Sequence, residues 1–119
     1  MNIDILKLGG IDVDSALEIL GDIEMYNETL QDFLDEVKDR LPKLEEYKNK
    51  EDMQNYAILV HAMKSDSKYL GFKLLAELSY DHEMKSKENN IDYIKNNYDK
   101  LIEEANRIID VAREYLKEN

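Results

Sequence analysis

The fold of this chain is decided by the stretch His61-Ala62-Met63-Lys64-Ser65-Asp66-Ser67-Lys68-Tyr69-Leu70-Gly71. Together with the residues just before it, this stretch has the spacing of a helix with one face turned inward. The inward stripe consists of Tyr56, Val60, Met63, Ser67 and Leu70. Because successive helical residues are rotated by about 100°, His61 points away from this stripe and is expected to face water.

A ring of small, apolar and basic side chains is expected around the His61 imidazole. The residues within about 60° of it on the same helix are Gln54, Ala57, Ile58, Lys64, Ser65 and Lys68. Lys64 follows His61 by one turn, which places its ammonium group beside the ring. An exposed imidazole next to an ammonium group favours the approach of an anion.

This stretch resembles the H-x-x-K-[GS]-x-[SA]-x-x-[LI]-G signature of histidine-containing phosphotransfer (HPt) domains. His61, Lys64, Leu70 and Gly71 occupy the matching positions. The resemblance extends upstream, where residues 10–17 look like the family's lead-in helix and residues 25–34 like the segment after it. Two positions depart from the pattern: Ser65 replaces the more usual glycine, and His82 replaces an apolar residue, usually leucine. A serine at position 65 predicts slower or more selective transfer.

The resemblance implies that His61 accepts and donates a phosphoryl group in a multistep two-component phosphorelay. Lys64 is then the electrostatic neighbour of the phosphohistidine, and Lys68 is either a second neighbour or a solvated surface charge. The implied docking face consists of Gln54, Ala57, Ile58, Ser65, Lys68 and Gly71, with Gly71 also ending the helix. The implied partners are the receiver domain of a response regulator, a hybrid histidine kinase, or both. Mg²⁺ is expected in the partner receiver, and no cofactor or metal of this chain's own.

A histidine carrier has three physical requirements. Its ring must be exposed, its neighbours must not repel a phosphoryl dianion, and its surroundings must let a partner approach. A neutral imidazole is a nucleophile near neutral pH and can form a high-energy bond to phosphorus. The chain has neither G-x-x-x-x-G-K-[ST] nor G-x-G-x-x-G for binding a nucleotide. We therefore expect a phosphoryl carrier that depends on its partners, rather than a self-sufficient enzyme.

Composition limits the remaining classes of function. The 119 residues suit one domain, and a single proline with four glycines leaves little room for a turn-rich β fold. The absence of cysteine excludes disulfides and thiolate chemistry. A net charge of −11 disfavours binding to nucleic acid or to an anionic membrane surface. We expect a cytoplasmic monomer, and leave open whether the chain was cut from a larger signalling protein.

The apolar pattern predicts an all-α fold, an antiparallel up-down-up-down four-helix bundle with an extra short N-terminal helix. Residues 1–10 are set apart as an N-terminal segment that either packs onto the bundle or is a linker remnant, and 11–119 form the HPt-like domain. A short helix capped by Asp12 or Asp14 stops at Gly21. A long helix over 23–47 is expected to continue through Pro42 with a bend. Asp52 is expected to cap the His61 helix, and two further helices follow Gly71 and Asn90.

Two alternatives remain open from the residues. The chain could be a non-phosphorylated helical adaptor that docks a receiver or kinase domain. It could also bind a metal through His61 or His82 with nearby carboxylates. His82 falls on the apolar stripe of its helix, which is typical of a histidine at the core edge bonded to a neighbour. The consecutive residues Asp81, His82 and Glu83 splay apart on a helix, which disfavours a shared metal.

Overall fold

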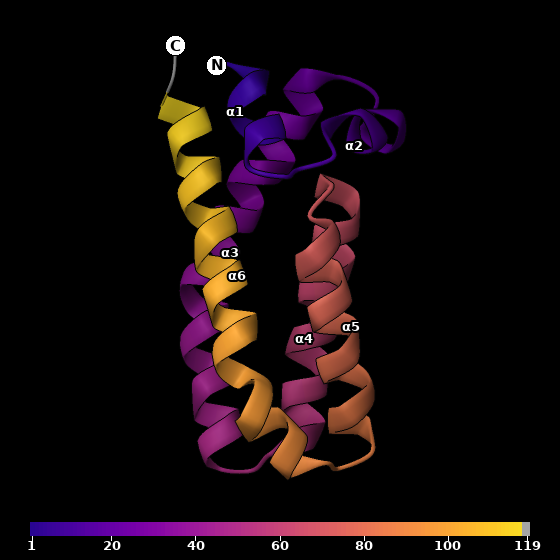
Figure 1. Cartoon of the computed structure of the whole chain (residues 1–119), viewed down its shortest axis with the longest axis vertical. Helices are drawn as coiled ribbons and strands as arrows, with labels where there is room; N and C mark the ends of the chain where they lie inside the picture. The colour runs from indigo at the N-terminus through magenta and orange to yellow at the C-terminus, as the bar shows by residue number, and fades with distance from the viewer. Residues whose placement is uncertain (118–119) are drawn as a thin grey trace.

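The computed structural model describes residues 1–117, which form six helices and no strand (Figure 1). The helices are α1 (Ile3–Leu8), α2 (Val13–Leu20), α3 (Ile23–Asn49), α4 (Met53–Leu70), α5 (Lys73–Lys87) and α6 (Ile91–Lys117). The all-helical class predicted from the sequence is confirmed. Positions 118 and 119 of the expected 11–119 domain lie outside the described residues.

The four long helices pack side by side into an elongated body of 42 × 24 × 20 Å. α3 contacts α4, α4 contacts α5, α5 contacts α6, and α6 contacts α3. Figure 1 shows the connections from α3 to α4 and from α5 to α6 at one end, and α1 and α2 gathered at the other end. The α4 and α5 helices, joined by a short turn at that second end, form the hairpin on which His61 lies.

Acidic side chains begin three of these helices. Asp12, Asp22 and Asp52 each accept a hydrogen bond from the backbone N–H three residues later, at the starts of α2, α3 and α4. Such a cap satisfies one of the N–H groups that a helix start leaves free. The predicted cap at Asp52 is confirmed, and α2 uses Asp12 rather than Asp14. The α3 helix is uninterrupted and extends two residues past the predicted end at Tyr47, with Pro42 inside it.

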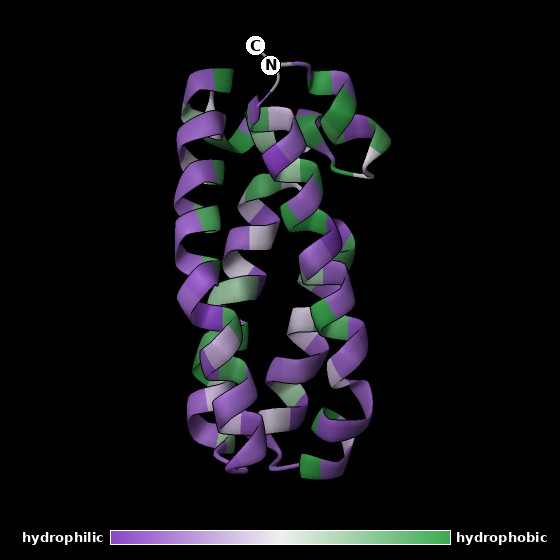
Figure 2. Cartoon of the chain, turned by 90° about the vertical axis from the view of Figure 1, so that its left-hand side faces the viewer, coloured by the Kyte–Doolittle hydropathy of each residue, from purple (hydrophilic) through white to green (hydrophobic). Residues whose placement is uncertain are grey.

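Apolar side chains from all six helices form one core. The predicted α4 stripe is buried throughout: Tyr56, Val60, Met63, Ser67 and Leu70 each have 0% exposure. Figure 2 shows the outer faces of the helices to be mainly hydrophilic, with hydrophobic residues recurring on the sides turned toward neighbouring helices. None of the helices in the described part of the chain has an apolar run suited to crossing a bilayer.

The N-terminal segment packs onto the bundle. Leu6 of α1 is fully buried, and the Arg107 guanidinium on α6 donates to the Gly9 carbonyl at 2.7 Å. Of the two sequence-based readings for residues 1–10, the structure therefore favours packing over a linker.

Gly71 lies apart from the face expected to bind a partner. It ends α4 with φ +83°, and its carbonyl accepts a hydrogen bond of 2.9 Å from the Asp12 N–H. The residue is buried, and a Cβ there would collide with the Asp12 backbone. Its expected role in ending the helix is confirmed, whereas its expected place on the docking face is wrong. The backbone of Asp12, at the start of α2, covers Gly71, an arrangement that local spacing does not reveal.

His82 is a fully enclosed residue rather than one at the core edge. It is 1% exposed, and its Nδ1 lies 2.8 Å from the Tyr56 hydroxyl. Its Nε2 lies 3.2 Å from the Asn97 carbonyl oxygen, which can only accept. That carbonyl requires a proton on Nε2, and because burial lowers the pKa of His82 the ring is neutral near pH 7, so Nδ1 accepts from the Tyr56 hydroxyl. Neither nitrogen is therefore free to bind a metal. Within residues 1–117 no group of three or more His, Cys, Asp or Glu side chains is placed to hold a metal ion.

Candidate functional site

His61 faces solvent, as the helical rotation predicts. Its side chain is 57% exposed on α4, opposite the buried stripe that holds this helix in the core. Because the α4 backbone is fixed by that packing, the position of the ring depends mainly on its side-chain contacts. One such contact comes from the neighbouring helix α5.

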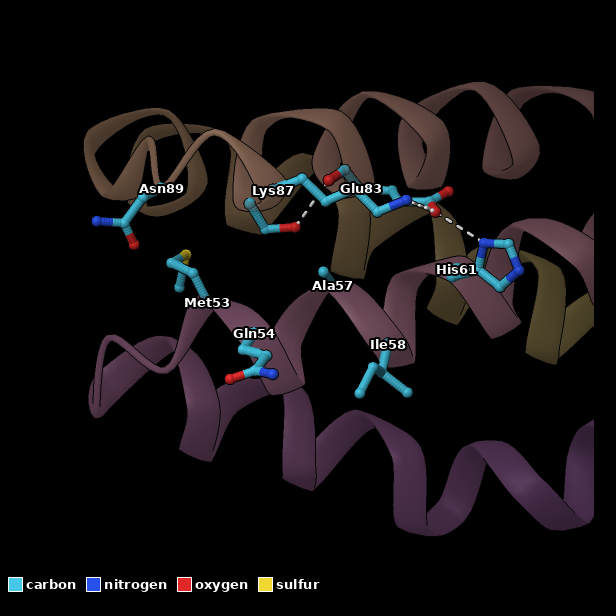
Figure 3. Close-up of a pocket in the computed structure, with 9 residues that line it drawn as sticks. Met53, Gln54, Ala57, Ile58, His61, Glu83, Lys87 and Asn89 are labelled. Carbon is cyan, nitrogen blue, oxygen red and sulfur yellow. Dashed lines mark hydrogen bonds and ion pairs between the residues drawn. The ribbon is translucent and has the colours of Figure 1, made fainter.

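The carboxylate of Glu83 is the centre of the site (Figure 3). This α5 residue is 2% exposed and interacts with three side chains. His61 Nδ1 lies 2.7 Å from Glu83 Oε2, and Lys87 Nζ lies 2.9 Å from the same oxygen. Lys64 Nζ donates to the other oxygen, Oε1, at 2.7 Å. The cluster joins α4 to α5 and holds the imidazole at the edge between them.

These contacts determine the charge of Glu83 and the tautomer of His61. Burial by itself raises the pKa of Glu83, but hydrogen bonds from Lys64, Lys87 and His61 outweigh it and lower the pKa from 4.5 to about 2. Glu83 is consequently ionised near neutral pH and can only accept. The proton of a neutral His61 ring must therefore reside on Nδ1. This leaves the Nε2 lone pair free to act as a nucleophile.

The two lysines differ in how far they reach solvent. The Lys64 side chain is 16% exposed and also lies over the Tyr80 ring, with Nζ 5.6 Å from the centroid. The Lys87 side chain is 58% exposed. Lys64 is close to His61, as its spacing predicts, but its ammonium group is bound to a buried carboxylate and contributes to the α4–α5 contact. Lys87 is the more accessible cation of the pair.

The other residues expected around His61 divide into three groups. Gln54, Ile58 and Lys68 are exposed, and Ser65 is half-buried. Ala57 is only 7% exposed, and it lies along a groove between α4 and α5. Gly71 is absent from this face, as described above.

Sequence reasoning missed Glu83 and Lys87. Glu83 was considered only as part of a weak metal-binding trio with Asp81 and His82. The available signal was positional: Glu83 lies one turn from Ser79 and Ser86, on the inward side of α5. A carboxylate on the buried side of a helix requires donors from a neighbouring helix, and the His61 helix precedes it directly in the chain.

Comparison with known proteins gives one match. The family model described as "Hpt domain" matches residues 28–108, a span that includes His61, Lys64 and Glu83. Searches of curated proteins and of solved structures each returned no match. The matched span covers more than half of the chain and contains both helices that build the site. This chain therefore belongs to the Hpt domain family.

Proposed function

We propose that His61 is the residue on which this chain carries a phosphoryl group, exchanged with receiver domains in a multistep two-component phosphorelay. Membership of the Hpt family implies histidine phosphotransfer in phosphorelays generally. The observation that supports His61 in particular is its exposed ring with Nδ1 bound to the buried Glu83 carboxylate. The fold that goes with this role is the up-down-up-down bundle, with α4 and α5 presenting the ring.

The Nδ1–H tautomer of His61 determines which ring nitrogen attacks the phosphorus. The Nε2 lone pair attacks the phosphorus of an aspartyl phosphate on the receiver, so a phosphorus–nitrogen bond forms while the bond from phosphorus to the aspartyl oxygen breaks. The carboxylate leaves with the electron pair. Because Nδ1 keeps its proton, the ring becomes positively charged, and the Glu83 carboxylate at 2.7 Å stabilises that charge. The reverse transfer returns the electron pair to Nε2, and no proton needs to leave the ring in either direction.

The surrounding cations compensate the negative charge of the phosphoryl group. Lys64 and Lys87 together carry one more positive charge than Glu83 neutralises. A phosphoryl dianion therefore arrives at a locally positive site, although the whole chain has a net charge of −11. Mg²⁺ would be held by the receiver, where it neutralises charge on the phosphoryl oxygens.

The decisive experiment is transfer from a phosphorylated receiver domain in the presence of Mg²⁺. Wild-type protein is expected to acquire acid-labile phosphate on His61, and His61→Ala is expected to remain unlabelled. His82→Leu is the matched control, because its buried ring is shielded from any partner. Equal labelling of His61→Ala and wild type would overturn the assignment. A receiver that binds without labelling would instead support the adaptor alternative.

A further inference from the structure

The two lysines of the site bind the Glu83 carboxylate in different ways. Lys64 Nζ donates to Oε1 at 2.7 Å, whereas Lys87 Nζ lies 2.9 Å from Oε2, which His61 Nδ1 also contacts at 2.7 Å. Figure 3 shows Lys87 and His61 pointing toward the same carboxylate. Because these two residues share one oxygen, the Lys87 ammonium group is a near neighbour of the ring.

The ammonium group of Lys64 is enclosed. The Lys64 side chain is 16% exposed, and its Nζ lies 5.6 Å from the centroid of the Tyr80 ring, within the range of a cation–π interaction. If Lys64 turned toward a phosphoryl group, Oε1 of Glu83 would lose its donor, and Glu83 is only 2% exposed. An unpaired buried acceptor is costly, so Lys64 stays with Glu83 when His61 is phosphorylated.

Lys87, in contrast, can leave Glu83 at little cost. Its side chain is 58% exposed, so the ion pair that it gives up is screened by solvent. It also lines a groove of about 690 Å³ between α4 and α5, which His61 borders and Lys64 does not. If Lys87 turns toward a phosphoryl group on Nε2, Oε2 of Glu83 keeps its contact with His61 Nδ1. The movement therefore leaves no buried acceptor unpaired.

We propose that Lys87, rather than Lys64, is the cation that binds the phosphoryl oxygens when His61 is phosphorylated. Lys64 is then a positioning residue, which acts on the ring only through Glu83. This inference rests on the proposed phosphotransfer function and gives Lys87 the part that the family resemblance implies for Lys64. The charge-assisted hydrogen bond from Lys87 forms as the negative charge arrives at Nε2, so it stabilises the phosphorylated state and the transition state that leads to it.

The test compares Lys87→Met with Lys64→Met, since methionine keeps an unbranched chain and removes the charge. The phosphoryl donor is phosphoramidate, a small molecule whose transfer to His61 needs no docking protein. Lys87→Met is expected to be labelled about tenfold more slowly than wild type, and Lys64→Met within about threefold of it. Lys87→Arg keeps a cation and should also be labelled within about threefold of wild type.

Two further measurements separate contact with the phosphoryl group from a structural role. In ³¹P NMR titrations of the phosphorylated proteins, the second ionisation of the phosphoryl group should move up by about 0.5–1 pH unit in Lys87→Met, because a bound cation favours the dianion. It should stay within about 0.2 pH unit of wild type in Lys64→Met. Thermal melts should show the reverse order, with a loss of about 5–10 °C in Lys64→Met and less than about 3 °C in Lys87→Met.

Lys73→Met is the matched control. Lys73 is also on α5, and its Nζ likewise makes an ion pair of 2.9 Å, here with Asp12, from a side chain that is 74% exposed. It lies about 21 Å from Lys87 along the helix. Its labelling rate should stay within about twofold of wild type, and its ³¹P titration should be unchanged.

The outcomes separate the role of Lys87 from the proposed function. Labelling of Lys87→Met at the wild-type rate, or an unshifted ³¹P titration in that variant, would overturn the role of Lys87, whether or not Lys64→Met is stable enough to assay. An equal or larger loss of labelling in Lys64→Met or Lys73→Met would also overturn it. Failure of phosphoramidate and of every phosphorylated receiver to label His61 in wild type would overturn the proposed function itself.

Discussion

Replacing Glu83 by glutamine tests the physical basis of the site. Glutamine keeps the shape of the side chain but removes the negative charge that accepts hydrogen bonds from His61, Lys64 and Lys87. The fall in the pKa of Glu83 from 4.5 to about 2 corresponds to about 3 kcal/mol in favour of the folded, ionised state. Solvent screens two of the three donors, since the side chains of His61 and Lys87 are 57% and 58% exposed. We therefore expect Glu83→Gln to lower the free energy of unfolding by about 2 kcal/mol at pH 7.

The pH dependence gives this prediction a second, independent readout. Because the pKa of Glu83 is lowered in the folded state, the ionised carboxylate contributes fully to the free energy of unfolding above about pH 4.5. This contribution is lost as the pH falls toward about 2. The difference between wild type and Glu83→Gln should shrink over that range, since the wild-type carboxyl then also becomes neutral. Urea denaturation, monitored by circular dichroism at several pH values, measures this difference in the free energy of unfolding.

The control for this measurement is Glu77→Gln. Glu77 lies on the same helix but is exposed, so its replacement should change stability by less than about 0.5 kcal/mol. The reasoning is refuted if Glu83→Gln is no more destabilising than Glu77→Gln at pH 7. A difference from wild type that remains constant down to pH 2 would show that shape, rather than charge, accounts for the loss. Phosphoramidate labelling of His61 should also slow in Glu83→Gln, because a neutral amide oxygen replaces the carboxylate that holds the Nδ1–H tautomer and stabilises the positive charge on the ring.

Two further predictions concern the scaffold. Gly71→Ala should lower the free energy of unfolding by about 2–3 kcal/mol, because it adds a collision with the Asp12 backbone to the strain of a positive φ. Gly21→Ala is the control, because Gly21 also has a positive φ but no atom lies within 4 Å of the added Cβ. An equal loss in the free energy of unfolding for the two variants would contradict the collision. Burial lowers the pKa of His82, so the folded state should lose stability as the pH falls below about 6.5. In thermal melts at several pH values, the melting temperature of His82→Leu should lack this part of the decline. An unchanged pH profile in His82→Leu would show that another group is responsible.

Most of the fold follows from local patterns. The periods of apolar residues predict the long helices, and the caps at Asp12 and Asp52 mark where two helices start. The outward direction of His61 also needs only the rotation of a helix whose opposite face is apolar. The helices, their caps and the direction of His61 each depend on residues within a few turns of each other, so they can be predicted from the sequence alone. The helical state of residues 3–8 was missed, because six residues are too few for a periodic signal.

The sequence by itself determined that this chain is helical and that an imidazole stands exposed on α4. Only the tertiary structure decided what that imidazole can do. Glu83 is 22 residues from His61, and the two meet because α5 folds back along α4. The α4–α5 hairpin also forms the groove beside the ring, and the start of α2 packs against Gly71. Local spacing specifies the face of one helix, whereas the tautomer of a ring depends on the acceptor that another helix brings to it.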